Sequence, residues 1–135
     1  MESLNSIAES VLKKYSVVAT DEKIRQVSGW LTDKKANELV ALNIPEKASI
    51  AESAIIVTAS SIRHAQGLAD TVLERCREEN FEFLRMEGFA VGEWILLDLN
   101  DVIVHIFQEE SRERYRLEEL WPNATVLADT RLERR

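Results

Sequence analysis

The stretch GEWILLDLNDVIVHIF, residues 92–107, decides the fold of this chain. Its two apolar runs, Trp94–Asp98 and residues 102–107, are separated by Leu99, Asn100 and Asp101, and we expect Leu99-Asn100 to form the turn. β-Branched residues dominate the second run, as is typical of strands. Asn tolerates the left-handed backbone that a two-residue hairpin turn requires. The stretch therefore predicts an antiparallel β-hairpin that is entered through Gly92-Glu93.

Another apolar run lies upstream of the hairpin, at residues 54–59, and has the sequence AIIVTA. Strands that are buried on both faces read in this way. Ser60-Ser61 then offers N-caps for a helix over residues 62–79, which Asn80 ends. Gly67 lies inside this helix, and we expect close packing on the sheet to offset its cost. The order predicts a parallel strand–helix–strand crossover into a strand over residues 81–86.

The remaining segments complete an α/β (α+β) prediction. Thr20-Asp21 is a candidate N-cap for a helix over residues 21–35, and residues 39–44 form an apolar run before Pro45. We expect a short helix over residues 109–116. These elements predict a mixed sheet of about five strands with helices packed on it. The predicted organisation is an N-terminal arm with a short helix (1–20), one domain (21–122) and a polar, fraying tail (123–135).

Charge and composition limit the function classes. The 135 residues carry a net charge of −7 and the pI is about 4.9. A net negative charge argues against binding of nucleic acid phosphates by the protein surface. It is compatible with a basic protein partner, and it is equally compatible with a charge that only keeps the domain soluble. The lone Cys76 permits no internal disulfide, and no apolar run is long enough for a membrane span. A cytoplasmic protein is expected.

Two polar groups raise the question of a ligand site. Ser60, Ser61, Arg63 and His64 stand at a predicted helix N-terminus, which favours anions. The same residues also fit a simple helix cap beside a surface Arg-His pair.

Cys76 belongs to the apolar stripe of the helix, which favours a structural role over a nucleophilic one.

Asp98, Asp101 and His105 gather around the hairpin. A metal site would need them to converge on one point, whereas Asp at hairpin ends is commonly turn chemistry. His105 shares a strand face with Ile103 and Phe107, which is typical of a satisfied, partly buried histidine. We therefore predict no metal, no cofactor and no catalytic residue.

Trp94 stands at the start of a predicted strand, directly after Gly92-Glu93. One interpretation places its indole in the core. The other exposes it beside Glu93, where it would anchor a protein partner, since Trp dominates many interfaces.

Four motifs, taken in order, resemble the ribosomal silencing factor family, also called Iojap-like. The resemblance covers roughly residues 34–121. It is strongest in Arg63-His64-Ala65-Gln66 with Ala69-Asp70, Glu87-Gly88 with Gly92 to Asp98, Asp101 to Phe107, and Tyr115, Leu117-Glu118 and Leu120-Trp121. The chain departs from the family pattern at Glu52-Ser53-Ala54, Ala59 and Arg116. The first departure removes aromatic residues and affects one expected contact patch.

The resemblance implies a nucleotidyltransferase-like fold without enzyme activity. It implies a translation repressor that binds the large ribosomal subunit at ribosomal protein fourteen of the L series and sterically blocks joining of the small subunit. The implied contacts make little use of nucleic acid or membrane. The predicted partner-binding residues are Arg63, His64, Glu87, Glu93, Trp94, Asp98, Asp101 and His105.

Other functions stay open at this point. A large-subunit assembly factor would use the same binding face. A nucleotidyltransferase-like enzyme would need a pair of carboxylates on one strand, whereas Asp98 and Asp101 flank a turn. A homodimer through an exposed strand face is a further hypothesis.

Overall fold

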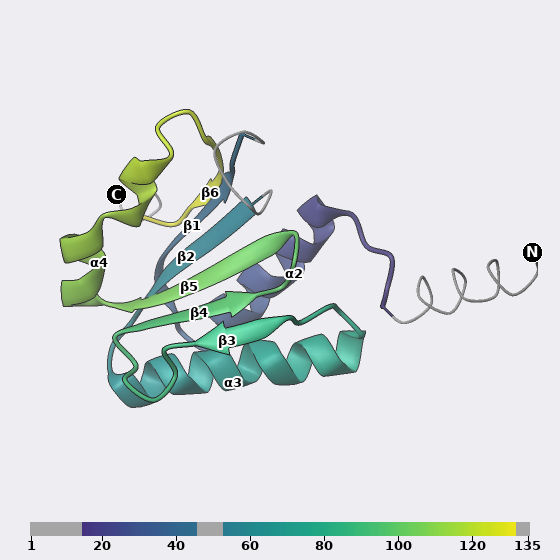
Figure 1. Cartoon of the computed structure of the whole chain (residues 1–135), viewed down its shortest axis with the longest axis horizontal. Helices are drawn as coiled ribbons and strands as arrows, with labels where there is room; N and C mark the ends of the chain where they lie inside the picture. Colours follow the sequence, from purple (N-terminus) through teal and green to yellow (C-terminus); the bar gives the residue numbers. More distant parts are fainter. Residues whose placement is uncertain (1–14, 46–52, 132–135) are drawn as a thin grey trace, which may run out of the picture.

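A computed structural model describes residues 15–45 and 53–131, so most of the predicted N-terminal arm lies outside the described residues. One mixed sheet forms the centre, with helices on its two faces (Figure 1). The elements in chain order are α2 (Thr20–Asp33), β1 (Asn37–Asn43), β2 (Ser53–Ala59), α3 (Ile62–Glu79), β3 (Arg85–Glu87), β4 (Trp94–Asp98), β5 (Val102–Gln108), α4 (Glu109–Tyr115), the 3-10 helix η2 (Leu117–Leu120) and β6 (Thr125–Asp129).

The sheet has six strands in the order β3-β4-β5-β2-β1-β6. β2 and β5 are parallel, and the other neighbouring strands are antiparallel. The predicted α+β class and the antiparallel hairpin of β4 and β5 are confirmed. The sixth strand corrects the expectation of a fraying polar tail, because β6 pairs with β1 beyond the predicted boundary at residue 122.

Central strand β2 is buried along its whole length, as its β-branched sequence predicts. α3 then follows with the expected caps: the Ser61 hydroxyl accepts from the backbone N–H of His64, and Asn80 adopts the left-handed conformation. Gly67 is exposed, and a Cβ added there would meet nothing within 4 Å, so the expectation that it packs on the sheet is wrong.

Three further boundaries differ from expectation. α2 begins at Thr20 with Ala19 as its N-cap, because the Thr20 hydroxyl instead donates to Asp101 at 2.8 Å. The third strand covers only Arg85–Glu87, because Phe81 turns into the core and stacks on Trp30. The hairpin loop has three residues, with Asn100 in the left-handed conformation at φ 81°.

Two apolar clusters lie on opposite faces of the sheet. α2 and α3 cover the first face, where the larger cluster includes Leu31, Ile55 and Val104. α4 and η2 cover part of the second face, where Ile56, Phe107 and Leu117 form a smaller cluster. α4 lies over β5 and β2 and reaches β4 through Tyr115, whereas β3 lies farther along the sheet (Figure 1), so the part of this second face over β3 and β4 is left open.

Candidate protein-binding site

Aromatic side chains gather at the border between the covered and open halves of the second face. Trp94 on β4 stands directly opposite Phe107 on β5, and their ring centroids are 4.9 Å apart. Tyr115, at the end of α4, also contacts Trp94, with ring centroids 5.0 Å apart, and its ring lies 6.3 Å from that of Phe107. Trp94 is therefore half-buried: one part of the indole belongs to the core and the rest reaches the surface.

His105 lies beneath this border. Its side chain is buried, and the residue is 5% exposed. The indole N–H of Trp94 donates to His105 Nδ1 at 3.1 Å. Burial lowers the pKa of His105 to about 4, although the nearby charge of Glu118 acts in the opposite direction. The imidazole is thus neutral at physiological pH, as expected for a satisfied buried histidine.

Apolar side chains continue the surface on both sides of Trp94. Strand register puts Leu96 opposite His105 and Ile103 opposite Asp98, and both apolar side chains are half-buried. Tyr115 and Leu120 are exposed, and Leu120 reaches 66%. Exposed apolar groups of this size that share one face are typical of interaction sites. We refer to Trp94, Leu96, Ile103 and Tyr115 as the aromatic face, and we infer that Leu120, which follows in η2, extends it.

Acidic groups border the aromatic face. β3 pairing places Glu87 opposite Leu96 and Arg85 opposite Asp98, so alternation along the strands brings Glu87 and Asp98 to the same side as Leu96. Glu93 is exposed at the entrance to β4. Of the predicted partner-binding residues, Glu87, Trp94 and Asp98 therefore share one face of the sheet, and their part in binding stays a prediction.

Two glycines shape the entrance to Trp94. Gly88 and Gly92 both have positive φ, at 81° and 75°, and the Gly92 N–H donates to the Gly88 carbonyl. A Cβ at Gly88 would lie 2.1 Å from the carbonyl oxygen of Trp94, and one at Gly92 would lie 2.6 Å from a methyl group of Ile62. Only glycine fits both positions, which explains the spacing before Glu93-Trp94.

The remaining hairpin residues have structural partners. Asp101 accepts from Lys23 Nζ at 2.7 Å and from Thr20, which ties α2 to the hairpin. Asp98 accepts from the Asn100 N–H at 2.9 Å, as turn chemistry predicts. Within residues 15–45 and 53–131, no three His, Cys, Asp or Glu side chains are grouped to hold a metal ion.

At the start of α3, where the sequence raises the question of an anion pocket, the side chains of His64 and Ser61 already have hydrogen-bond partners within the chain. His64 Nδ1 accepts from the Ser60 N–H at 2.9 Å, and Nε2 donates to the Lys34 carbonyl at 2.8 Å. Ser61 is the N-cap. His64 therefore joins α3 to the end of α2, while Arg63 is exposed. The anion hypothesis loses His64 and Ser61 as available ligands.

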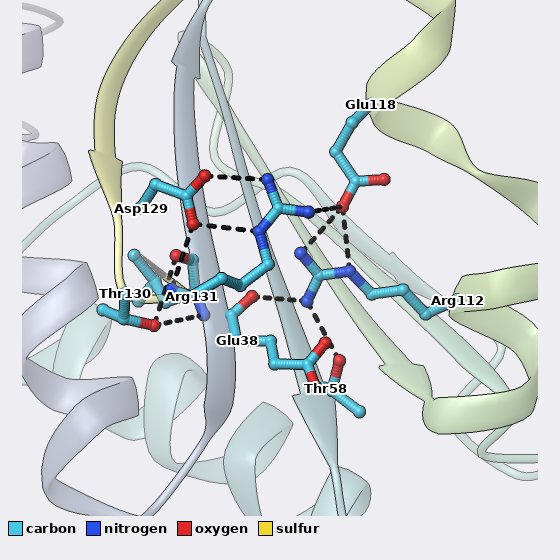
Figure 2. A network of polar contacts seen from close by, with 8 residues as sticks. Glu38, Thr58, Arg112, Glu118, Asp129, Thr130 and Arg131 are labelled. Carbon is cyan, nitrogen blue, oxygen red and sulfur yellow. Dashed lines mark hydrogen bonds and ion pairs between the residues drawn. The ribbon is translucent and has the colours of Figure 1, made fainter. Parts of the chain in front are cut away.

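Sequence reasoning did not identify the polar network that holds α4 and η2 on the sheet (Figure 2). The Nε atom of Arg112 donates to the Glu118 carboxylate at 2.8 Å. Its Nη1 atom donates to the Thr58 hydroxyl at 2.9 Å and to the Glu38 carbonyl. Arg131 lies 3.9 Å from the same Glu118 oxygen and is paired with Asp129. One feature of the sequence could have indicated this network. α4 directly follows a buried strand yet has almost no apolar residue, so polar contacts must hold it on the sheet.

Cys76 is buried in the helix-covered core. Burial raises the pKa of its thiol to about 11, so the thiol stays protonated and the structural interpretation holds. Among the described residues, no helix is both long and apolar enough to cross a membrane. The fold and the aromatic face together define a small α+β domain with an open face suited to a protein partner.

Comparison with known proteins identifies the family. The family described as "Ribosomal silencing factor during starvation" matches residues 17–135. Ribosomal silencing factor RsfS of Halalkalibacterium halodurans is 34% identical over 110 residues, covering 82% of this chain and 94% of the relative. RsfS of Haemophilus influenzae is 38% identical over 87 residues, covering 64% and 85%. The chain belongs to the ribosomal silencing factor family.

A solved structure shares the fold. The crystal structure of a protein from Bacillus halodurans superposes with a TM-score of 0.69 at 33% identity, covering 78% of this chain and 98% of the other. The resemblance noted from the sequence motifs is therefore confirmed.

Proposed function

We propose that this protein binds the large ribosomal subunit at ribosomal protein fourteen of the L series and blocks its association with the small subunit, so that translation is repressed. The observation that carries the proposal is the aromatic face in a chain of this family. In this role the protein acts in the cytoplasm.

The chemistry of the face supports a protein partner that is basic. Tyr and Trp are enriched among residues that dominate binding energy. Glu87 and Asp98 lie on the same side of the sheet as Trp94, where Arg85 pairs with Asp98, and the whole chain carries a net charge of −7. An acidic rim accelerates encounter with a basic surface and orients it, while the apolar centre supplies most of the affinity.

The proposed mechanism is occlusion. The protein occupies a surface that the small subunit needs, so repression depends on affinity and on position and requires no turnover. Removing one exposed anchor should therefore reduce repression in proportion to lost occupancy.

The test is sedimentation of the purified protein with separated ribosomal subunits, followed by an assay of subunit joining. We expect co-sedimentation with large subunits and reduced joining. Absence of binding to either subunit would overturn the proposal. Binding without reduced joining would contradict occlusion and favour the assembly role. Sedimentation of the protein alone tests the predicted homodimer.

A matched pair of variants tests the location of the face. Leu120 is 66% exposed and Val17 is 91% exposed, so replacing either by Asp leaves the core unchanged. We expect Leu120→Asp to weaken large-subunit binding by tenfold or more, as is typical of an interface anchor. Val17→Asp carries the same change of charge outside the face and should bind like wild type. Equal binding by both variants would place the interface elsewhere.

A further inference from the structure

The predicted partner-binding residues include both Trp94 and His105, yet the two differ in exposure. Trp94 reaches the surface, whereas His105 is 5% exposed and lies beneath it. A docking protein that meets the indole cannot reach the imidazole behind it. His105 therefore needs a role that does not involve direct contact with the partner.

Several rings fix the imidazole. The Phe107 ring is nearly parallel to it, at 14° and with centroids 6.4 Å apart, and the Trp121 ring lies at the same centroid distance. Its strand is paired on both sides, with Leu96 opposite on β4 and Ile56 opposite on β2. His105 is thus a rigid support, set in the sheet before any partner arrives.

The hydrogen bond from Trp94 defines the tautomer. Because Nδ1 accepts the indole N–H at 3.1 Å, the imidazole proton must be on Nε2. A protonated imidazole has no acceptor and would lose this bond. The lowered pKa of His105, about 4, agrees with a neutral ring that keeps its acceptor.

We propose that His105 is a positioning residue for partner binding: it holds the Trp94 indole in one orientation and takes up its N–H, so that only the apolar ring surface meets the partner. The inference rests on the proposed function and deepens it. Without the acceptor, the indole would lose its fixed rotamer, and its N–H would lose a partner when the interface excludes water. The partner site over Trp94 is accordingly one that packs on a ring and offers no acceptor to the indole.

Two substitutions separate the acceptor from the bulk of the ring. His105→Phe keeps an aromatic ring in an apolar site and removes the acceptor. His105→Asn places a carbonyl oxygen close to the position of Nδ1 and restores an acceptor. We expect His105→Phe to weaken large-subunit binding about five- to tenfold, which corresponds to the loss of one hydrogen bond, and His105→Asn to recover part of the affinity.

A double-mutant cycle with Trp94→Phe tests whether His105 acts through the indole N–H. Trp94→Phe keeps a ring and removes the N–H. In that background, His105→Phe should cause no further loss of affinity. If the two losses multiply instead, or if folded His105→Phe binds like wild type, the positioning role is overturned.

A spectroscopic readout on the free protein tests the hydrogen bond independently of the ribosome. The chain has three Trp residues, so a nitrogen-15 spectrum has three indole N–H signals, and Trp94→Phe identifies one. We expect His105→Phe to move that signal and to accelerate its exchange with water, and His105→Asn to restore protection. An unchanged signal would refute the hydrogen bond. If wild type itself fails to bind large subunits, the proposed function fails, and the positioning role fails with it even where the signal behaves as expected.

Discussion

The two faces of the sheet are closed by different physical means. Against α2 and α3, the buried side chains are almost all apolar, from Leu31 in α2 to Val104 in β5. Against α4 and η2, a smaller apolar cluster is supplemented by the buried Arg112 and by His105. The first face is held by hydrophobic burial, whereas the second depends on a few polar contacts with defined partners.

The reason for the difference lies in the sequence of α4. Its seven residues, Glu109–Tyr115, include one ring and otherwise only charged residues and Ser. Such a helix cannot bury an apolar stripe. It therefore remains on the sheet through Arg112 and its partners. This leaves the neighbouring half of the sheet open, and a face that is only partly covered is one that a partner can reach.

The largest predicted effect is on the helix-covered face. Ile55 is fully buried at the centre of β2, so Ile55→Ala should cost about 4 kcal/mol of unfolding free energy through lost burial and a cavity. Because the core is shared, denaturant unfolding should stay cooperative, with a shifted midpoint. Leu96→Ala, on the open half, is the control and should cost about 1 kcal/mol or less. Equal costs would contradict the division into closed and open halves.

Arg112→Ala should cost about 3 kcal/mol, because it leaves the half-buried Glu118 carboxylate and the Thr58 hydroxyl without their cation. In contrast to Ile55→Ala, the loss should be local: hydrogen exchange should accelerate over residues 109–121 before it does so in β2. Arg112→Met fills the site with an apolar chain of similar length, and Glu118→Gln removes the opposing charge. A double variant carrying both should be more stable than Arg112→Ala. Uniform acceleration across the sheet would refute a local anchor.

Much of the fold could be predicted from local signals. The β-branched run in β2, the Ser61 cap and Asn80 end of α3, and the left-handed Asn100 each determine their own element. β6 gave no such signal, because four of its five residues are exposed and its pairing with β1 brings together segments about eighty residues apart. An edge strand of this kind is recognisable only once the sheet exists.

The site shows the same limit. The sequence predicted that the hairpin is entered through Gly92-Glu93, and the structure adds that only glycine fits at Gly88 and Gly92. By contrast, the partners of Asp101, His64 and Arg112 come from distant segments: Lys23, the Lys34 carbonyl and Thr58 respectively. Each polar residue looked available in the sequence because nothing local reveals such a partner.

Acidification should weaken the second face more than the first. The pKa of His105 in the folded protein is about 4, below its usual value of 6.5, so the unfolded chain takes up a proton first as the pH falls. Stability linked to His105 is complete above the unfolded pKa and is lost as the pH falls toward about 4. Between about pH 7 and about pH 5 the loss should be about 2 kcal/mol.

Denaturant midpoints of wild type and His105→Phe measured across this range isolate the effect, because the variant has no imidazole to titrate. Carboxylates shared by both proteins cancel in the difference. If the two proteins lose stability in parallel, His105 does not carry the pH dependence of this face.

The smallest predicted effect distinguishes the inner and outer parts of the polar network in Figure 2. Arg131 lowers the pKa of the Asp129 carboxyl through a hydrogen bond, yet its own side chain is 44% exposed, against 8% for Arg112. Exposed pairs are screened by water and salt, so Arg131→Ala should cost about 0.5 kcal/mol, and less at high salt. Raising the salt concentration should remove most of this cost while leaving that of Arg112→Ala nearly unchanged. If Arg131→Ala equals Arg112→Ala in cost, the network acts as one unit, and β6, which was missed as a strand, would be as necessary to the second face as α4.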